Sequence, residues 1–446
     1  MIKPEPAPPT EKIFNDPSLF HKLLGRSDEP DFLKLIEKAN EDYLYWDRFK
    51  QIWSLPDIPA EEAWAYLIFM RTVKMKSIPL KSREGKPFWY WVPDSFLRAL
   101  HQMDQNAAGT ILVEDPEAHA GAREQFVISS LMEEAIASSQ LEGAATTRDV
   151  AKEMLRTGRK PKNTAERMIL NNYVTMKALK KYIKEPLSRK MILEIHTLLS
   201  KDTHSDKSIA GRFRRNDEEV RVIWNDGTVL HVPPPADELE ERMAALCEFA
   251  NTEDHHFIHP AIKGMILHFW LAYDHPFADG NGRTARALFY WYMLKKRYWL
   301  MEYMSISRVI KTAPAKYAKA YLYSESAGED LTYFLNYHLN VIERAMAEFQ
   351  GYVRYKAEEA REAKVKISMV EDLNNRQSQL LYKMLTEPEA AMTIQRHRNT
   401  FGTTYETART DLLSLAKRGY LRQHRKGKQF VYTVTDKLKR KAGLEK

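Results

Sequence analysis

The chain has 446 residues, of which 44% are hydrophobic, so it is too long for one ordinary domain and can form two or three with buried cores. A single cysteine, Cys247, excludes an internal disulfide framework and a thiolate zinc cluster. The formal net charge is +8, and residues 371–446 hold this whole excess, with 16 Lys and Arg against 8 Asp and Glu. That localisation suggests an anionic partner for the C-terminal segment.

Membrane and secretory classes are not expected. No apolar run approaches the roughly 18 residues that span a bilayer, since the most hydrophobic segment, 265–273, is interrupted by His268. The N-terminus is rich in proline and lacks the apolar stretch of a secretory signal. We therefore expect a cytoplasmic protein without membrane contacts.

Helical periodicity dominates residues 31–76. Four apolar residues of this segment form one stripe at helical spacing: Phe32, Leu35, Ile36 and Ala39. Residues 81–92 read as a turn-rich connector into the aromatic run PFWYWV, and a helix is expected to begin near Pro93. A strongly helical pattern then runs from Arg123 to Glu142 and stops at Gly143, because glycine takes the left-handed conformation of a C-cap without strain.

Later segments continue the helical pattern with one interruption. Further helices are expected over 164–184, 188–200, 238–251, 260–273 and 282–296. Two short β-rich runs around the sequence Asn-Asp-Gly predict a hairpin over 220–232. A long helix over 331–366 is expected to lead into the C-terminal region, so the chain is predicted to be mainly α.

The segment HPFADGNGRTAR, which begins at residue 275, has the features of a phosphate site. Gly280 and Gly282 flank Asn281, so the backbone can turn its N–H groups toward an anion. This turn opens a helix, whose first N–H groups and positive dipole end favour phosphate. Arg283 and Arg286 are three residues apart and can project from one side of that helix, where guanidinium groups suit phosphate oxygens.

The same segment holds a proton acceptor and a metal ligand. Asp279 offers a hard oxygen ligand where Mg²⁺ would bridge two phosphates. His275 ends the preceding helix and can accept a proton near neutral pH. Taken one by one, these residues describe only a glycine-rich turn between two helices. Together in so short a window, they indicate a nucleotide-phosphate site with a general base.

This string resembles the complete signature of the Fic family, HPFxDGNGRxxR. The resemblance implies a mostly helical Fic core that transfers AMP from ATP to a Ser, Thr or Tyr hydroxyl of a target protein or of itself. His275 would deprotonate the hydroxyl, Asp279 would hold Mg²⁺, and Asn281 with the glycine amides would orient the α-phosphate. Arg283 would neutralise the departing pyrophosphate. The related Doc toxins, which phosphorylate, carry a loop that resembles HxFxxANKR, so the Gly-Asn-Gly sequence favours the AMP-transferring branch.

The segment SSQLEG, from Ser138 to Gly143, fits the pattern (S/T)xxxE(G/N) of the inhibitory helix in Fic proteins. A carboxylate at a helix C-terminus needs a cation, and for Glu142 the resemblance supplies Arg286. That pairing would occupy the arginine and crowd the γ-phosphate, so that ATP binds unproductively. The alternative is an ordinary helix end with a solvated glutamate. In some family members this glutamate also supports removal of AMP, which stays open here as a second activity.

The predicted hairpin lies at the position of the Fic flap, which holds an extended target segment by strand addition. Val222, Ile223 and Trp224 are the flap residues expected to contact such a segment. The alternative is a hairpin that packs on the core for stability alone.

The C-terminal region reads as helices from residues 376, 393 and 404, followed by a hairpin, and resembles a winged helix-turn-helix domain. Five residues are placed to face a major groove: Thr404, Tyr405, Thr407, Arg409 and Thr410. Arg425, Lys426 and Lys428 would meet phosphates, so DNA contact is expected through residues 403–428. The alternative is a winged helix used for dimerisation or target docking, which leaves a homodimer open.

The expected organisation is mainly α, with an all-helical Fic core and a β-hairpin flap. Its parts are an N-terminal helical region, 1–110; the core, 111–345, with the inhibitory helix at about 124–142; a helical connector, 346–370; and the winged-helix domain, 371–446. The expected function is AMP transfer with ATP and Mg²⁺, autoinhibited by Glu142. A different class is a DNA-binding regulator whose core only senses nucleotide, but a sensor need not retain His275.

Overall fold

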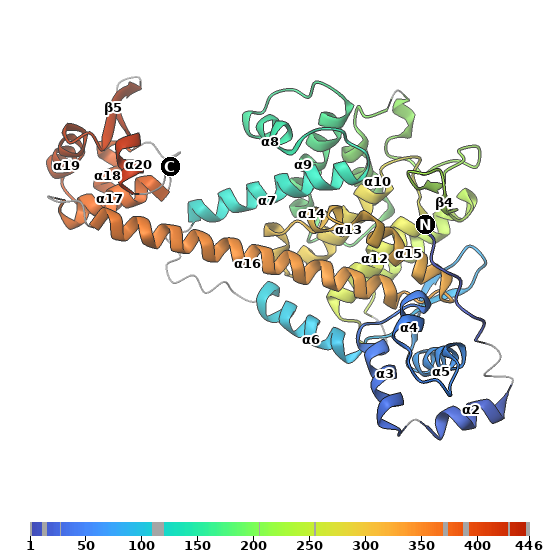
Figure 1. Cartoon of the computed structure of the whole chain (residues 1–446). Coiled ribbons are helices and arrows are strands. Elements are labelled where there is room, and N and C mark those ends of the chain that lie inside the picture. Colours follow the sequence, from blue (N-terminus) through green and yellow to red (C-terminus); the bar gives the residue numbers. More distant parts are fainter. Residues whose placement is uncertain are drawn as a thin grey trace. The chain divides into compact units, whose positions relative to one another are not determined.

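The computed structural model describes residues 2–10, 16–26, 28–108, 120–204, 206–253, 256–368, 373–386, 392–426 and 429–442 (Figure 1). The chain divides into two compact units: Met1–Ile111 with Val127–Met346, and Leu112–Phe126 with Ala347–Lys446. Helices predominate, which confirms the mainly α prediction. The four-part organisation expected from the sequence stays a prediction.

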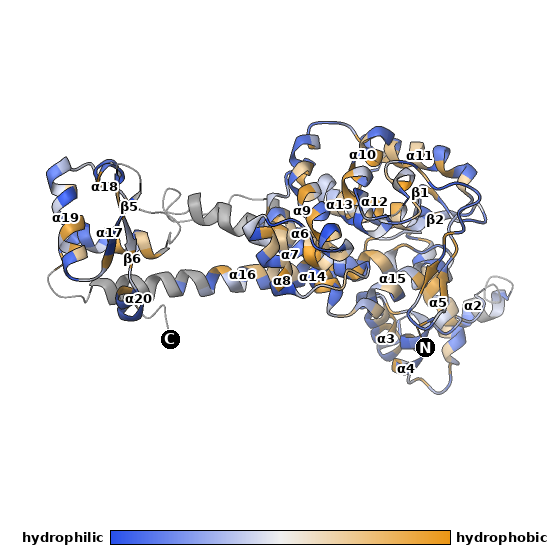
Figure 2. Ribbon diagram, turned by 90° about the horizontal axis from the view of Figure 1, so that it is seen from above, coloured by the Kyte–Doolittle hydropathy of each residue, from blue (hydrophilic) through white to orange (hydrophobic). Residues whose placement is uncertain are grey.

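Short helices and a buried arginine form the N-terminal part of the first unit. The helices are α2 (Pro17–Leu24), α3 (Pro30–Glu41), α4 (Trp46–Ile52) and α5 (Ala60–Thr72), and Figure 2 shows hydrophobic residues concentrated in α5. The predicted stripe faces this core, with Phe32, Ile36 and Ala39 buried. The guanidinium of Arg71 donates to Asn40 Oδ1 and to Tyr333 Oη, both at 2.9 Å. It thereby ties α5 to α16 (Thr332–Ser368).

Residues 76–90 form a β-hairpin, so the connector predicted over 81–92 is wrong in part. β1 (Lys76–Lys81) pairs antiparallel with β2 (Pro87–Tyr90). Ile78 and Leu80 are buried and alternate with exposed neighbours, but the proline between them, a residue depleted in strands, hides this pattern. The predicted start of the next helix is confirmed, since α6 (Asp94–Met103) follows Pro93.

α12 (Pro260–Asp274) and α13 (Asn281–Lys295) are the buried centre of the first unit. α9 (Thr164–Tyr182) and α10 (Arg189–Ser200) pack on α13, and α11 (Leu239–Asn251) packs on α12. All five lie within two residues of their predicted ranges at each end. α7 (Ala120–Leu141) ends just before Glu142, and Gly143 has the left-handed φ of 90° that its role as a C-cap requires.

Other elements complete this unit. The predicted hairpin is present as β3 (Val222–Ile223) and β4 (Val229–His231). The sequence patterns do not predict α8 (Arg148–Thr157), α14 (Ile306–Lys311) or α15 (Pro314–Ser326). α14 has only 6 residues, too few for a helical period to repeat. Within the described ranges, no helix has both the length and the hydropathy to cross a bilayer.

The second unit contains the predicted C-terminal helices and hairpin. The helices are α17 (Asn375–Thr386), α18 (Ile394–Phe401) and α19 (Tyr405–Lys417), and β5 (Leu421–Lys426) pairs with β6 (Gln429–Val434). Thr404 caps α19 by accepting a hydrogen bond from the Thr407 N–H. α20 (Asp436–Lys441) is an addition that the sequence patterns do not predict. Lys428, expected to meet a phosphate, lies outside the described residues.

Candidate active site

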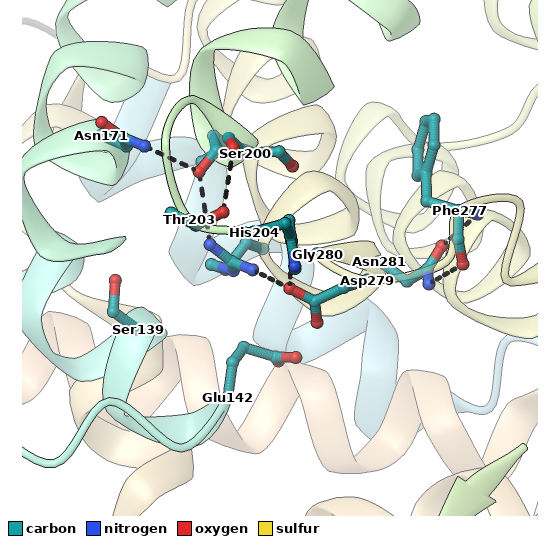
Figure 3. Close-up of polar contacts among 12 residues, drawn as sticks. Ser139, Glu142, Asn171, Ser200, Thr203, His204, Phe277, Asp279, Gly280 and Asn281 are labelled. Carbon is teal, nitrogen blue, oxygen red and sulfur yellow. Dashed lines mark hydrogen bonds and ion pairs between the residues drawn. The ribbon is translucent and has the colours of Figure 1, made fainter. Parts of the chain in front are cut away.

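The motif loop, residues 275–280, joins α12 to α13 and is held rigidly by its own side chains. Asn281 Oδ1 accepts from the Phe277 N–H at 2.9 Å, and its Nδ2 donates to the Phe277 carbonyl at 2.8 Å (Figure 3). Phe277 itself is fully buried and anchors the loop in the core. Gly280 has a φ of 82° and opens α13, whose first N–H groups have no intrahelical partner. The loop thus presents a helix N-terminus suited to a phosphate group.

His275 lies at the C-terminal end of α12 with a left-handed φ of 48°. Its Nδ1 is 3.1 Å from the Ala272 carbonyl, so Nδ1 carries the proton and Nε2 keeps the lone pair of the neutral ring. Burial lowers the pKa of His275 to about 4, although the Ala272 carbonyl and Glu142 act to raise it. At neutral pH the imidazole is therefore uncharged and able to accept a proton at Nε2.

Asp279 lies beside two basic side chains. Its Oδ2 accepts from Nη2 of Arg283 at 2.7 Å and lies 3.1 Å from Nε2 of His204. The Asp279 side chain is 44% exposed, whereas the Arg283 side chain is fully buried. The carboxylate is therefore accessible to a ligand from one side and charge-compensated from the other.

Glu142 reaches the same loop from the end of α7. Its Oε1 accepts from Nη2 of Arg286 at 2.9 Å, and Nε of Arg286 donates to Ser138 Oγ at 2.8 Å. A side chain at Gly282 would meet this carboxylate, because a Cβ placed there would lie 2.2 Å from Glu142 Oε1. Three predicted residues from two distant parts of the chain are thus brought together: Ser138 and Glu142 from one, and Arg286 from the other.

The base of α7 is fixed to the core by a buried carboxylate. Glu134 is 1% exposed and accepts from Tyr290 Oη at 2.9 Å, Ser305 Oγ at 2.8 Å and the Ser307 N–H at 3.0 Å. Tyr290 belongs to α13, nearly three helical turns after the motif loop. These hydrogen bonds tie α7 to α13, the helix that carries Arg286, and to residues 305–307.

The β3–β4 hairpin, predicted to be a flap, is attached to α12 next to the motif loop. His231 of β4 bonds through Nε2 to the Tyr273 carbonyl at 2.7 Å and through Nδ1 to Glu325 at 2.9 Å. Val222 and Trp224 are half-buried, and Ile223 is 58% exposed. An exposed apolar residue on a short strand beside the loop suits contact with an extended peptide.

Sequence patterns miss two residues that hold the motif loop. Arg214 donates through Nε to the His275 carbonyl at 2.9 Å, and its backbone N–H donates to the Pro276 carbonyl at 2.8 Å. His196 of α10 stacks on Phe277 with ring centroids 3.7 Å apart, accepts from the Gly211 N–H at Nδ1, and so donates from Nε2 to the Asp279 carbonyl at 2.9 Å. Both are more than 60 residues from the loop in sequence, so no local spacing signals them.

Comparisons with known proteins agree with this geometry. Residues 186–293 match the Fic/DOC family. The protein adenylyltransferase Fic of Nematostella vectensis is 38% identical over 97 residues, 22% of this chain and 20% of that protein. The protein adenylyltransferase Fic of Drosophila ananassae is 35% identical over 124 residues, 26% of this chain and 23% of that protein. This chain therefore spans about a fifth to a quarter of the length of these relatives.

Solved structures of Fic proteins are similar to this chain at low identity. A Fic family protein from Desulfovibrio desulfuricans G20 has a TM-score of 0.49 and 20% identity, covering 76% of this chain and 94% of that one. Fic-1 from C. elegans has a TM-score of 0.47 and 16% identity, covering 78% and 92%. The family match includes the motif loop, all of α12 and residues 281–293 of α13. Residues 186–293 of this chain therefore form a domain of the Fic/DOC family.

Proposed function

We propose that this chain is a protein adenylyltransferase, which transfers AMP from ATP to a hydroxyl side chain of a protein and is restrained by Glu142. The observation that carries the proposal is the neutral His275, with its lone pair on Nε2, next to the N-terminus of α13. A proton acceptor beside a phosphate site is what activation of a hydroxyl nucleophile requires.

In the proposed reaction the hydroxyl oxygen attacks the α-phosphorus of ATP. The bond from that phosphorus to the bridging oxygen breaks, pyrophosphate leaves with the electron pair, and Nε2 of His275 takes the hydroxyl proton. The backbone N–H groups of Gly280, Asn281 and Gly282 would orient the α-phosphate. Arg283 and Arg286 would bind the remaining phosphates, because guanidinium groups pair well with phosphate oxygens.

Asp279 fits a divalent cation of the kind that accompanies ATP. Its carboxylate is half exposed at the edge of the loop, and Mg²⁺ in nucleotide sites usually takes one or two carboxylates, with phosphate oxygens and water completing its shell. Bound there, Mg²⁺ would offset phosphate charge during the displacement. Arg283, 2.7 Å from Asp279, holds the carboxylate in the orientation that this role needs.

Autoinhibition by Glu142 is supported by the carboxylate's position over Gly282 and its 2.9 Å contact with Arg286. An arginine bound to a protein carboxylate is less available to a phosphate, and a carboxylate beside the loop repels one. The γ-phosphate would therefore be pushed from the productive pose. AMP removal by the same site is the alternative activity, with Glu142 positioning a water molecule.

The test uses the full chain with ATP labelled at the α-phosphate. Glu142→Gly is expected to label itself or proteins of a cell lysate far more than wild type, and mass spectrometry would identify the modified hydroxyl. Glu142→Gly with His275→Ala should lose labelling and still bind ATP, which separates chemistry from nucleotide sensing. If Glu142→Gly binds Mg·ATP and transfers no AMP, the sensing alternative is favoured.

A second function, DNA contact, is supported by exposure in the second unit. Thr404, Tyr405, Arg409 and Thr410 are exposed at the start of α19, and Arg425 is exposed on β5. α19 is the second helix of a helix-turn-helix arrangement formed with α18. Exposed polar and basic side chains on such a helix suit contact with a major groove and its flanking phosphates. We propose that residues 403–428 contact DNA, and a binding isotherm that stays flat at low salt would contradict it.

A further inference from the structure

His204 belongs to none of the sequence motifs but lies next to Asp279 of the motif loop. It lies in the turn after α10, where Thr203 Oγ1 donates to the Ser200 carbonyl at 2.9 Å and Asp202 has a left-handed φ of 56°. This turn carries the imidazole to the motif loop, and Figure 3 shows His204 beside Asp279. Nε2 of His204 and Oδ2 of Asp279 are 3.1 Å apart.

That nitrogen is buried and makes no hydrogen bond with the part of the chain that the structure describes. The 3.1 Å approach to Asp279 is an ion-pair distance without the angle that a hydrogen bond needs. A buried polar atom without a hydrogen bond is costly and calls for a ligand that satisfies it. Its neighbour, the Asp279 carboxylate, is the group proposed to hold the metal ion.

The separation of the two atoms suits a shared ion. Two adjacent ligands of an octahedral ion, each about 2.1 Å from it, lie about 3.0 Å apart, close to the 3.1 Å between His204 and Asp279. No group of three or more metal-binding side chains occurs among the described residues. Phosphate oxygens and water would therefore fill the other positions, as is usual beside a nucleotide.

We infer that His204 is a second metal ligand at Asp279 and makes this site favour Mn²⁺ or Co²⁺ over Mg²⁺. The chemical reason is that imidazole nitrogen suits transition metals, whereas Mg²⁺ prefers carboxylate, carbonyl and water oxygens. The inference rests on the proposed function for the presence of a metal ion at Asp279. It goes beyond that function by naming the second ligand and the ion that it selects.

The experiment measures metal binding to the full chain without turnover. Glu142→Gly protein is loaded with Mn²⁺ and an ATP analogue that has a methylene bridge between the α- and β-phosphates. Pulsed electron paramagnetic resonance should detect ¹⁴N coupling from a directly bound imidazole. His204→Gln should abolish the coupling and weaken Mn²⁺ binding about tenfold, with a change of less than about threefold for Mg²⁺. The matched control is His256→Gln, at an exposed histidine, which should change neither.

The outcomes separate this inference from the proposed function. Mn²⁺ that binds and is lost in Asp279→Asn, but shows no nitrogen coupling, would overturn the role of His204 and leave the proposed function standing. Coupling that persists in His204→Gln would do the same. If the parent protein binds no Mn²⁺ with the analogue, the metal site at Asp279 is itself wrong, and both proposals fail. The spectrum of the parent protein does not depend on whether a variant folds.

Discussion

Oε1 of Glu142 lies 2.9 Å from Nη2 of Arg286 and, by the same atom, fills the space above Gly282. One carboxylate therefore acts on both halves of the phosphate site, the guanidinium that would bind phosphate and the backbone turn that would cradle it. Arg286 is buried, and it also donates from Nε to Ser138 Oγ and from Nη2 to the Ser138 carbonyl. An arginine held by these three hydrogen bonds cannot follow a phosphate without breaking them, which is the physical basis of the proposed restraint.

Replacing the charge alone should relieve part of the inhibition. Glu142→Gln keeps the size of the side chain and removes its charge, so it should raise AMP transfer less than Glu142→Gly does. Couplings between regulatory and active sites are usually worth about 1–3 kcal/mol, or roughly 5–150-fold. We expect Glu142→Gly to raise the rate of AMP transfer by a factor in this range, measured as initial rates with labelled ATP. Equal rates for wild type and both variants would contradict autoinhibition.

Weakening the attachment of α7 to the core at Glu134 should also raise AMP transfer. Glu134→Gln replaces a buried carboxylate that accepts hydrogen bonds from Tyr290, Ser305 and Ser307. It should lower the free energy of unfolding by about 1–3 kcal/mol, because the new amide group cannot accept at both ends. AMP transfer should rise at the same time, because Glu142 is then held less firmly against Arg286 and Gly282.

The neighbouring residue provides the control for this variant. Glu133 pairs with Arg148 and Lys152 of α8 instead of with α13, and its side chain is only 13% exposed. Glu133→Gln should therefore lower the free energy of unfolding and leave AMP transfer unchanged. If Glu134→Gln unfolds more easily and transfers AMP no faster, the attachment of α7 contributes to stability and does not control the activity of the active site.

Stability should fall as the pH drops below 6.5. Burial lowers the pKa of His275 and of His196 to about 4, and that of His338 to about 3. The unfolded chain binds protons at these residues near pH 6.5 while the folded chain does not, so the free energy of unfolding decreases from about pH 6.5 toward pH 4. Calorimetry at pH 7 and pH 5 should show a melting temperature several degrees lower at pH 5. No loss of stability over that interval would show that these histidines are not buried as described.

Activity should persist to a lower pH than it would with a histidine base of ordinary pKa. With the pKa of His275 near 4, kcat/KM of Glu142→Gly should stay level from pH 8 to about pH 5 and then decline. Glu142 acts to raise the pKa of His275, so its removal should not move the decline upward. A decline centred near pH 6.5 would indicate a solvent-exposed base instead.

DNA contact predicts a specific salt dependence. Arg425→Ala should weaken binding about equally for all sequences and reduce the slope of log K against log salt by about 1. Arg156→Ala, which removes an exposed arginine of α8 in the first unit, is the charge-matched control and should leave the slope unchanged. If the two variants behave alike, binding is a general effect of net charge.

Most of the motif loop can be predicted from the sequence, but few of the residues that support the loop can. His275, Asp279 and the Gly-Asn-Gly turn are adjacent in the chain, so local rules for helix ends and phosphate sites are enough to locate them. Arg214, His196 and His204 act on the loop from 61 or more residues away. Their roles depend on how α10 and the segment between α10 and β3 pack against the loop, which no residue spacing encodes.

Errors in the predicted fold have similar causes. The β1–β2 hairpin is missed because Pro79 interrupts an alternation that is otherwise clear in Ile78 and Leu80. α12 is predicted well because its sequence is rich in apolar residues and a proline opens it. Tertiary packing decides the first case and local sequence decides the second.

The most direct measurement of the central claim compares two purified variants that share the relieved restraint. Glu142→Gly should bind Mg·ATP and transfer labelled AMP to protein hydroxyls. The double variant Glu142→Gly, His275→Ala should bind Mg·ATP with similar affinity and transfer at least about a hundredfold less, the usual contribution of a general base. Equal transfer by both variants would show that His275 is not the proton acceptor, and the proposed mechanism would be wrong.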